Sequence, residues 1–174
     1  VATGGLLVTA QAGPLAREWN ISLAALTAAL ALDRIANGSG RVFWGWVSDK
    51  IGREKTMAIA FILQSACLVS VLLFGRVSGL LFTVTLVLTL FTWGEIYVLF
   101  PSILGDWFGT RNATSNYSFL YTAKGVASIL GGGLAAVLFQ QFGSWSAAFY
   151  GSATLALIAG LMALGLRVVP LPRK

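Results

Sequence analysis

The sequence contains no histidine, a single cysteine and few charged residues, and each shortage excludes a class of function. Only 10 % of the 174 residues are charged while 57 % are hydrophobic, which is too little charge to cover a soluble domain of this size. Without histidine and with Cys67 alone, the usual transition-metal ligands are missing and no disulfide can form within the chain. We therefore expect a membrane protein without a metal or other cofactor. No activated nucleophile points to an enzyme.

Five apolar segments predict an all-α bundle of transmembrane helices, because lipid cannot satisfy open backbone groups. These segments are residues 22–47, 56–74, 80–104, 116–141 and 146–167. Residues 1–13, before Pro14, are too short to cross a bilayer and lack the basic start and cleavage site of a signal peptide. We interpret them as the end of a truncated helix. Residues 1–174 are then expected to form the C-terminal part of a longer membrane protein.

The positive charges predict the orientation of these helices and do not indicate a nucleic-acid partner, since they are spread along loops and apolar segments. The basic residues of the expected loops 48–55 and 105–115 and of the tail are Lys50, Arg53, Lys55, Arg111, Arg167, Arg173 and Lys174. The opposite loops hold only Arg17 and Arg76. The positive-inside rule therefore predicts that the C-terminus lies in the cytoplasm of a cell membrane.

Several charged residues interrupt the apolar segments, namely Asp33, Arg34, Arg41, Glu95 and Lys124. A lysine at the centre of a span costs about 3 kcal/mol or more, so such residues usually face a cavity or a partner. The segments 56–74 and 146–167 carry no charge before residue 167 and can face lipid. The three charged segments are expected to surround a polar cavity. The alternative is that their charges pair with one another and only hold helices together.

The depths of four residues predict an anion site in this cavity. At about 1.5 Å per residue, Arg41 and Lys124 both lie on the order of 10 Å inside their segments, at one level. Trp93 and Tyr97, four residues apart on one helical face, bracket the same level. Arginine matches the planar geometry of a carboxylate and lysine adds a compact charge, so we expect a small carboxylate to bind here.

Two further residues share the face of Lys124 and can offer hydroxyl groups, namely Tyr121 and Ser128. Pro101 lacks an N–H and clashes with the carbonyl of Tyr97, so it predicts either a kink near Tyr97 or an ordinary helix end.

The acids in the spans have two interpretations. Glu95 lies near the level of Lys124 but projects from the side of its helix opposite Trp93 and Tyr97. We expect it to pair with Arg34 rather than to carry a proton. Asp33 can likewise serve in charge pairing or in proton coupling.

The string GRVFWGWVSDKIGREKTM carries a loop signature with the spacing GxxxD[RK]xGR, formed by Gly45, Asp49, Lys50, Gly52 and Arg53. It resembles the cytoplasmic loop of the major facilitator superfamily. Together with FTWGEIYVLFPS and YTAKGVASILGGGLAA, the string NGSGRVFWGWVSDKIGR resembles the oxalate:formate antiporter family within that superfamily.

This resemblance implies the C-terminal six-helix half of a twelve-helix carrier, whose N-terminal half and lipid bilayer would be its partners. It implies that Arg41 and Lys124 hold the substrate, that Trp93 and Tyr97 form the wall, and that the signature loop takes part in gating. The implied function is antiport of a small carboxylate by alternating access. Glu95 departs from the family pattern, which leaves a proton-coupled monocarboxylate symporter open. A non-transporting membrane sensor built on the same fold is a further alternative.

Overall fold

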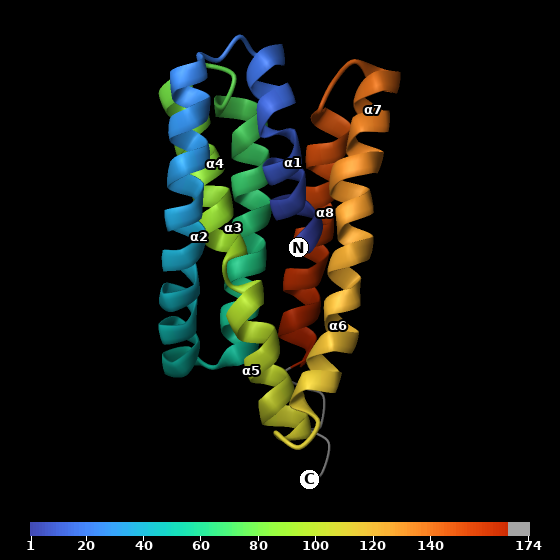
Figure 1. The fold of residues 1–174 in the computed structure, drawn as a ribbon. Coiled ribbons are helices and arrows are strands. Elements are labelled where there is room, and N and C mark those ends of the chain that lie inside the picture. Colours follow the sequence, from blue (N-terminus) through green and yellow to red (C-terminus); the bar gives the residue numbers. More distant parts are fainter. Residues whose placement is uncertain (167–174) are drawn as a thin grey trace.

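The computed structural model describes residues 1–166, which form a bundle of upright helices (Figure 1). The elements are α1 (Ala2–Glu18), α2 (Leu23–Ile51), α3 (Arg53–Phe74), α4 (Gly79–Trp93), α5 (Ile96–Phe108), α6 (Ala113–Ser128), the π-helix η1 (Ile129–Leu134), α7 (Ala135–Phe142) and α8 (Ser146–Leu166). No strand occurs among these residues, and the predicted all-α fold is confirmed. The basic tail used for orientation, with Arg167, Arg173 and Lys174, lies outside the described residues.

Four stretches of the described chain are long and apolar enough to cross a membrane. They are Arg53–Phe74, Gly79–Phe108, Ala113–Phe142 and Ser146–Leu166. The 29-residue helix α2 has the length to cross as well, but the charges along it set it apart in composition. These helices support a multi-pass membrane protein.

The predicted loop 48–55 is almost entirely helical. Only Gly52 separates α2 from α3, and its φ of 93° lies in the region that favours glycine, which lets the chain reverse within one residue. Asp49 and Lys50 therefore lie in the last turn of α2, while Arg53 begins α3. At the other end of the bundle the chain turns through serine caps. The hydroxyl oxygens of Ser22 and Ser78 accept hydrogen bonds from the backbone N–H groups of residues 25 and 81.

Two of the predicted spans are each interrupted. The segment expected at 80–104 breaks into α4 and α5 at Gly94 and Glu95, slightly before the kink predicted at Tyr97. Pro101 lies inside α5, which continues seven residues beyond it to Phe108, so the interpretation of Pro101 as a helix end is wrong. The segment expected at 116–141 passes through the π-helix η1.

The π-helix is tied to α1 by a side chain. Gln11 Nε2 donates a hydrogen bond of 2.9 Å to the carbonyl oxygen of Gly132. A π-helix replaces the i→i+4 backbone hydrogen bonds of an α-helix with i→i+5 bonds. The bond from Gln11 gives one carbonyl oxygen of this segment a side-chain partner. The helix α1 also continues through Pro14 to Glu18, so the apolar segment predicted at 1–13 does not end at the proline.

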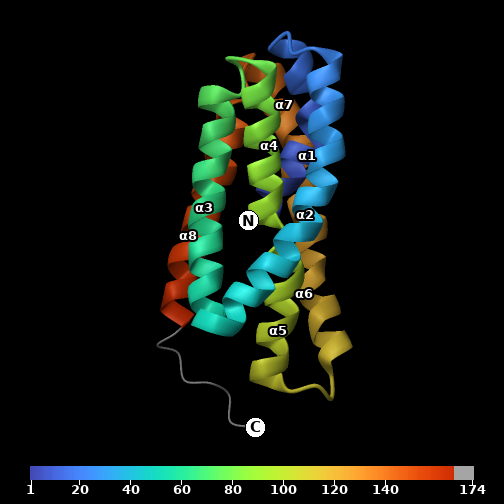
Figure 2. The same ribbon diagram turned by 90° about the vertical axis from the view of Figure 1, so that its left-hand side faces the viewer.

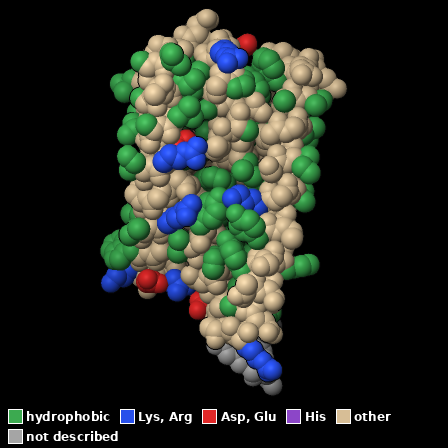
Figure 3. All heavy atoms as spheres, in the orientation of Figure 1, with side chains coloured by type: hydrophobic (Ala, Val, Ile, Leu, Met, Phe, Trp, Pro, Cys, Tyr) green, Lys and Arg blue, Asp and Glu red, His purple; other side chains and the backbone are tan. Residues whose placement is uncertain are grey.

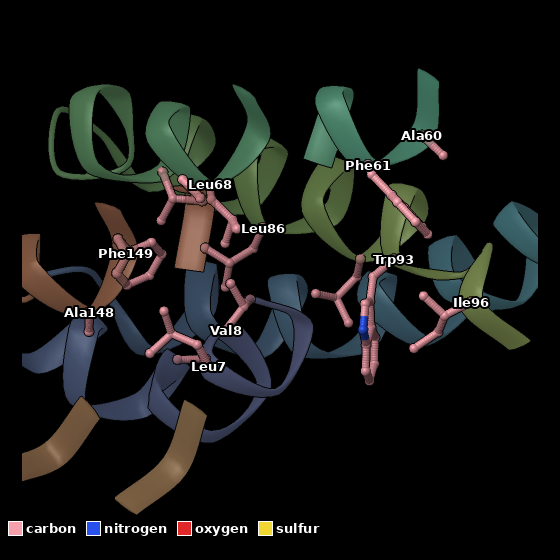
Figure 4. Packing of buried hydrophobic residues seen from close by; sticks show 14 of the residues in the cluster. Leu7, Val8, Ala60, Phe61, Leu68, Leu86, Trp93, Ile96, Ala148 and Phe149 are labelled. Carbon is pink, nitrogen blue, oxygen red and sulfur yellow. The ribbon is translucent and has the colours of Figure 1, made fainter. Parts of the chain in front are cut away.

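The helices pack around α1, which contacts α2, α4, α6, α8 and η1. The helix α3 packs mainly against α8, and α2 packs against α4; Figure 2 shows α2, α4 and α3 from the side. Buried aliphatic and aromatic side chains from α1, α3, α4 and α8 interlock in the core (Figure 4). The labelled residues include Leu7, Val8, Leu68, Leu86 and Phe149.

Candidate functional site

Arg41 on α2 and Lys124 on α6 meet around one aromatic side chain, Tyr97 at the start of α5. The guanidinium carbon of Arg41 lies 4.2 Å from the centre of the Tyr97 ring. Lys124 Nζ donates a 2.7 Å hydrogen bond to the Tyr97 hydroxyl oxygen and lies 4.7 Å from the centre of the same ring. Both cations therefore contact the same aromatic side chain.

Both cations line a cavity of about 470 Å³. The residues that line it come from α1, α2, α4, α5 and α6. They are Thr9, Asp33, Arg34, Asn37, Gly38, Arg41, Leu90, Trp93, Tyr97 and Lys124. None of the lining residues belongs to α3 or α8, the two helices that the charge distribution placed outside the polar cavity. In the space-filling view, basic side chains gather at mid-height on the face shown, among apolar groups (Figure 3).

Trp93 forms a buried part of the cavity wall. Its ring meets Tyr97 edge to face, with 5.5 Å between the centres and an angle of 78° between the planes. The Trp93 ring fits here because its neighbour on α1 is Gly5. A Cβ added to Gly5 would lie 2.1 Å from the indole ring. Trp93 and Tyr97 thus lie together as their spacing of four residues predicts, even though the helix breaks between them.

Tyr121 and Ser128 lie outside this cavity. Lys124 Nζ donates a second hydrogen bond, of 2.9 Å, to the Tyr121 hydroxyl oxygen, so Tyr121 holds the lysine from its own helix. Both Tyr121 and Ser128 line a separate pocket of about 400 Å³ next to Lys124. Ser128 shares the face of Lys124, as expected, but it makes no side-chain hydrogen bond within residues 1–166 and does not line the cavity of Arg41. Its short side chain lies one turn beyond Lys124, at the entry to the π-helix.

The acids pair differently from the prediction. Arg34 Nε lies 3.1 Å from Asp33 Oδ1, so Arg34 pairs with its neighbour in sequence and the predicted Arg34–Glu95 pair is wrong. Glu95 is fully buried in the turn between α4 and α5, and neither carboxylate oxygen has a hydrogen-bond partner in the described chain. The reason is geometric: Arg34 projects into the cavity, whereas Glu95 lines none of its walls.

A residue that the sequence did not single out as a site residue, Asn37, lies between the two arginines of α2. Its Oδ1 accepts a 2.9 Å hydrogen bond from Arg41, and its Nδ2 donates one of 3.3 Å to the carbonyl oxygen of Leu90. Asn37 therefore links Arg41 to the last turn of α4. The signal was available, because Asn37 lies on the same helical stripe as Arg34 and Arg41.

The carbonyl groups near the α4–α5 break are also met by side chains of α2. The Glu95 N–H donates to the carbonyl oxygen of Thr92, and not to that of Phe91 as in a regular α-helix. The Phe91 carbonyl oxygen instead accepts a 3.2 Å hydrogen bond from Trp44 Nε1. The backbones approach closely here, since a Cβ on Gly40 would lie 2.3 Å from the Phe91 oxygen. The break is therefore held against α2, next to the cavity.

The signature loop forms a second charged cluster, away from the cavity. Arg53 bonds to Asp49 at 2.7 Å and to Asp106 at 3.2 Å, and it also donates to the hydroxyl of Ser48. Asp106 lies near the end of α5, and nothing in the sequence predicted its part in this cluster. Arg53 thus joins the α2–α3 turn to the end of α5. Among the other signature residues, Gly45 has only the Val98 side chain near its Cβ position, and Lys50 is exposed.

The arrangement favours an anion in the cavity. Three basic side chains and one acidic side chain line it, which leaves a net positive charge. Arg41 and Lys124 contact no carboxylate within residues 1–166, and their partners are neutral oxygens and ring faces. A carboxylate entering here can take charge-assisted hydrogen bonds from both cations. No cluster of metal ligands occurs in the described chain.

Comparison with known proteins agrees with this geometry. The sequence pattern of the family described as "Major Facilitator Superfamily" matches residues 1–174. The oxalate:formate antiporter of Oxalobacter formigenes is 40 % identical over 167 residues, which is 96 % of this chain and 39 % of that protein. The uncharacterized transporter YhjX of the same superfamily, from Escherichia coli strain K12, is 29 % identical over 126 residues, covering 72 % of this chain and 31 % of the relative.

A third relative is the apicoplast pyruvate carrier 2 of Toxoplasma gondii, which is 31 % identical over 85 residues, 49 % of this chain and 13 % of the relative. The chain therefore spans at most about two fifths of the length of these curated relatives. With its signature loop, its helical bundle and a match along its whole length, the chain belongs to the major facilitator superfamily, in the oxalate:formate antiporter family that its motifs resemble.

Proposed function

We propose that this chain is the C-terminal half of a secondary carrier that moves a small carboxylate across a cell membrane by antiport. The single observation that carries the proposal is that two cations without a carboxylate partner in the described chain, Arg41 and Lys124, contact Tyr97 in one cavity. Such cations are costly beside hydrocarbon and are expected to serve a charged ligand. The name of the relative at 40 % identity supports oxalate or formate as the first anions to test.

In the proposed cycle the anion binds between Arg41 and Lys124 and neutralises both. The arginine presents a planar set of donors to the carboxylate, and the lysine, held by Tyr97 and Tyr121, adds a point charge. Neutralisation lowers the cost of closing the cavity, so the loaded carrier can rock between its two open states. The unloaded carrier keeps two unpaired cations, which opposes closure. This asymmetry favours exchange over net flow.

The Arg53 cluster is proposed to act as the gate on one side. Its bonds to Asp49 and Asp106 join the α2–α3 turn to α5, and they stabilise the state in which these helix ends are close. The positive-inside rule supports a cytoplasmic location for this side, together with the C-terminus.

The test is exchange of labelled oxalate and formate by the full-length parent protein in proteoliposomes. Truncating one partner of a buried charged contact costs about 2–5 kcal/mol, so Arg41→Ala and Lys124→Ala are each expected to reduce exchange by about thirty-fold or more. Arg76→Ala, which removes an exposed charge far from the cavity, serves as the matched control and should exchange normally. Undiminished exchange in both cavity variants would remove the proposed site.

A second candidate function is proton-coupled symport of a monocarboxylate, and Glu95 is the observation that favours it. A fully buried carboxylate with both oxygens unpaired is stable only when it is neutral, so it can hold a proton. Glu95→Gln keeps the shape and removes the proton. If uptake driven by a pH gradient persists in Glu95→Gln at the parent rate, the symport candidate fails.

A further inference from the structure

Arg34 lies in the same cavity as Arg41 and Lys124, yet the site described above does not use it. We propose that Arg34 forms a second anion position, which holds a small carboxylate before it reaches Arg41 and Lys124. This inference rests on the proposed transport function and deepens it. It predicts a two-step path within one cavity.

The first argument is the placement of the two arginines on α2. They are seven residues apart, so both project from one stripe of the helix, separated by about 10 Å along its axis. Both line the same cavity, as do Asn37 and Gly38 between them. The cavity volume of about 470 Å³ is enough for on the order of ten water molecules. A two-carbon acid at Arg41 leaves room for another at Arg34.

The second argument is the open edge of the Arg34 guanidinium. Its only charged contact in the described chain is Nε to Asp33 Oδ1 at 3.1 Å, and its side chain is 75 % exposed. Neither Nη atom of Arg34 has a hydrogen-bond partner within residues 1–166. A guanidinium offers five N–H donors in a fixed fork, so the pair of Nη atoms remains free to take both oxygens of a carboxylate.

The third argument is the asymmetry of the Asp33–Arg34 pair. The Asp33 side chain is only 5 % exposed, whereas that of Arg34 is 75 % exposed. Asp33 needs Arg34, because a buried carboxylate without a partner is strongly destabilising. Arg34, however, can contact Asp33 and a second anion together. The negative charge of Asp33 weakens that second contact, which suits a position from which the anion must move on.

The simpler explanation is that Arg34 only neutralises Asp33, and an isosteric variant separates the two explanations. Asp33→Asn removes the acid while keeping the shape. If Arg34 is an anion position, its affinity for the anion should rise, and the KM for labelled oxalate exchange by the full-length parent should fall by about three- to five-fold. If Arg34 is only the partner of Asp33, removing the acid should leave the KM unchanged, which would overturn the proposal.

The double variant Asp33→Asn with Arg34→Gln tests the same position without leaving a buried acid unpaired. We expect its KM to be at least about five-fold above that of Asp33→Asn alone, with the KM of Arg76→Gln unchanged. Equal KM values for the single and double variants would overturn the second position. Arg41→Gln and Lys124→Gln, measured beside them, report on the main site. If these two exchange normally, the proposed function fails, whereas a failure of the Arg34 prediction alone leaves that function intact.

Discussion

The cavity and the signature loop both contain a central basic residue on or next to α2, but the surroundings of that residue differ. In the loop, Arg53 contacts two carboxylates and a hydroxyl group of the protein itself. In the cavity, Arg41 and Lys124 contact an amide oxygen, two phenol oxygens and ring faces. A cation whose donors are taken by acids holds two parts of a protein together. A cation with neutral partners keeps its charge available for a ligand.

Among the tests of this contrast, the largest expected effect comes from placing an acid in direct contact with Arg41. Asn37 Oδ1 already accepts a bond of 2.9 Å from Arg41, so Asn37→Asp would place a carboxylate on that guanidinium. A close charge pair couples by about 1.5 kcal/mol or more, and we expect the KM for the anion to rise at least ten-fold. The measurement is anion exchange by the full-length parent in proteoliposomes.

The control for this variant is Asn37→Ala. It loses the same bond to the Leu90 carbonyl, which an aspartate cannot donate, but it adds no charge. If Asn37→Ala and Asn37→Asp raise the KM equally, the effect comes from the lost bond, and the contrast between the two basic sites is weakened.

Tyr97→Phe is expected to have the next largest effect. The variant removes the hydroxyl oxygen that accepts from Lys124 and leaves the ring beside Arg41. A hydrogen bond to a charged group contributes about 1.5–3 kcal/mol, so the KM should rise about ten-fold or more. Tyr121→Phe is the matched control, since Tyr121 also bonds Lys124 but lies outside the cavity. An equal rise in both variants would mean that the hydroxyl groups only position the lysine.

The packing that supports the cavity wall can be tested with two glycines of α2. A Cβ on Gly40 would lie 2.3 Å from the Phe91 backbone oxygen, whereas one on Gly38 meets nothing within 4 Å. We expect Gly40→Ala to destabilise the folded protein by about 1–3 kcal/mol and Gly38→Ala to have little effect on thermal unfolding. Equal melting temperatures would show that α2 and α4 can separate at no cost.

The smallest effect is expected in the signature loop. Asp106→Asn removes one of the two acids bound to Arg53, and partly exposed ion pairs contribute only about 0.2–1 kcal/mol. The anion KM should stay at the parent value, and only the maximal exchange rate should change, because the cluster links helix ends and does not line the cavity. A changed KM with an unchanged maximal rate would contradict the gating role.

Much of the site was accessible from the sequence because helical geometry is regular. Counting residues along a helix predicts depth, and this places Arg41 and Lys124 at the level of Trp93 and Tyr97, where the structure has them. The spacing of seven residues puts Arg34 and Arg41 on one stripe. The broad division into inner helices with charges inside their spans and the helices α3 and α8, whose spans 56–74 and 146–166 carry none, follows from the cost of charge in lipid.

The main error in the prediction has one cause, which is that a span was treated as a single straight helix. The break at Gly94 and Glu95 turns the acid into the interior, so it cannot reach Arg34. Ser128 continues the regular helix of Lys124, but its short side chain does not line the cavity that the long lysine side chain reaches. The contact between Arg53 and Asp106 joins residues 53 positions apart, and no local pattern announces it.

By itself, the sequence determined that this protein is a bundle of membrane helices with two cations at one depth. Hydrophobicity, the cost of buried charge and the regular rise of a helix act along the chain and can be read from it. Only the tertiary structure decided which partner each charge meets. That choice depends on where helices break and how closely their backbones approach, as at Gly40 and Gly94, and these distances are set by contacts between segments far apart in the chain.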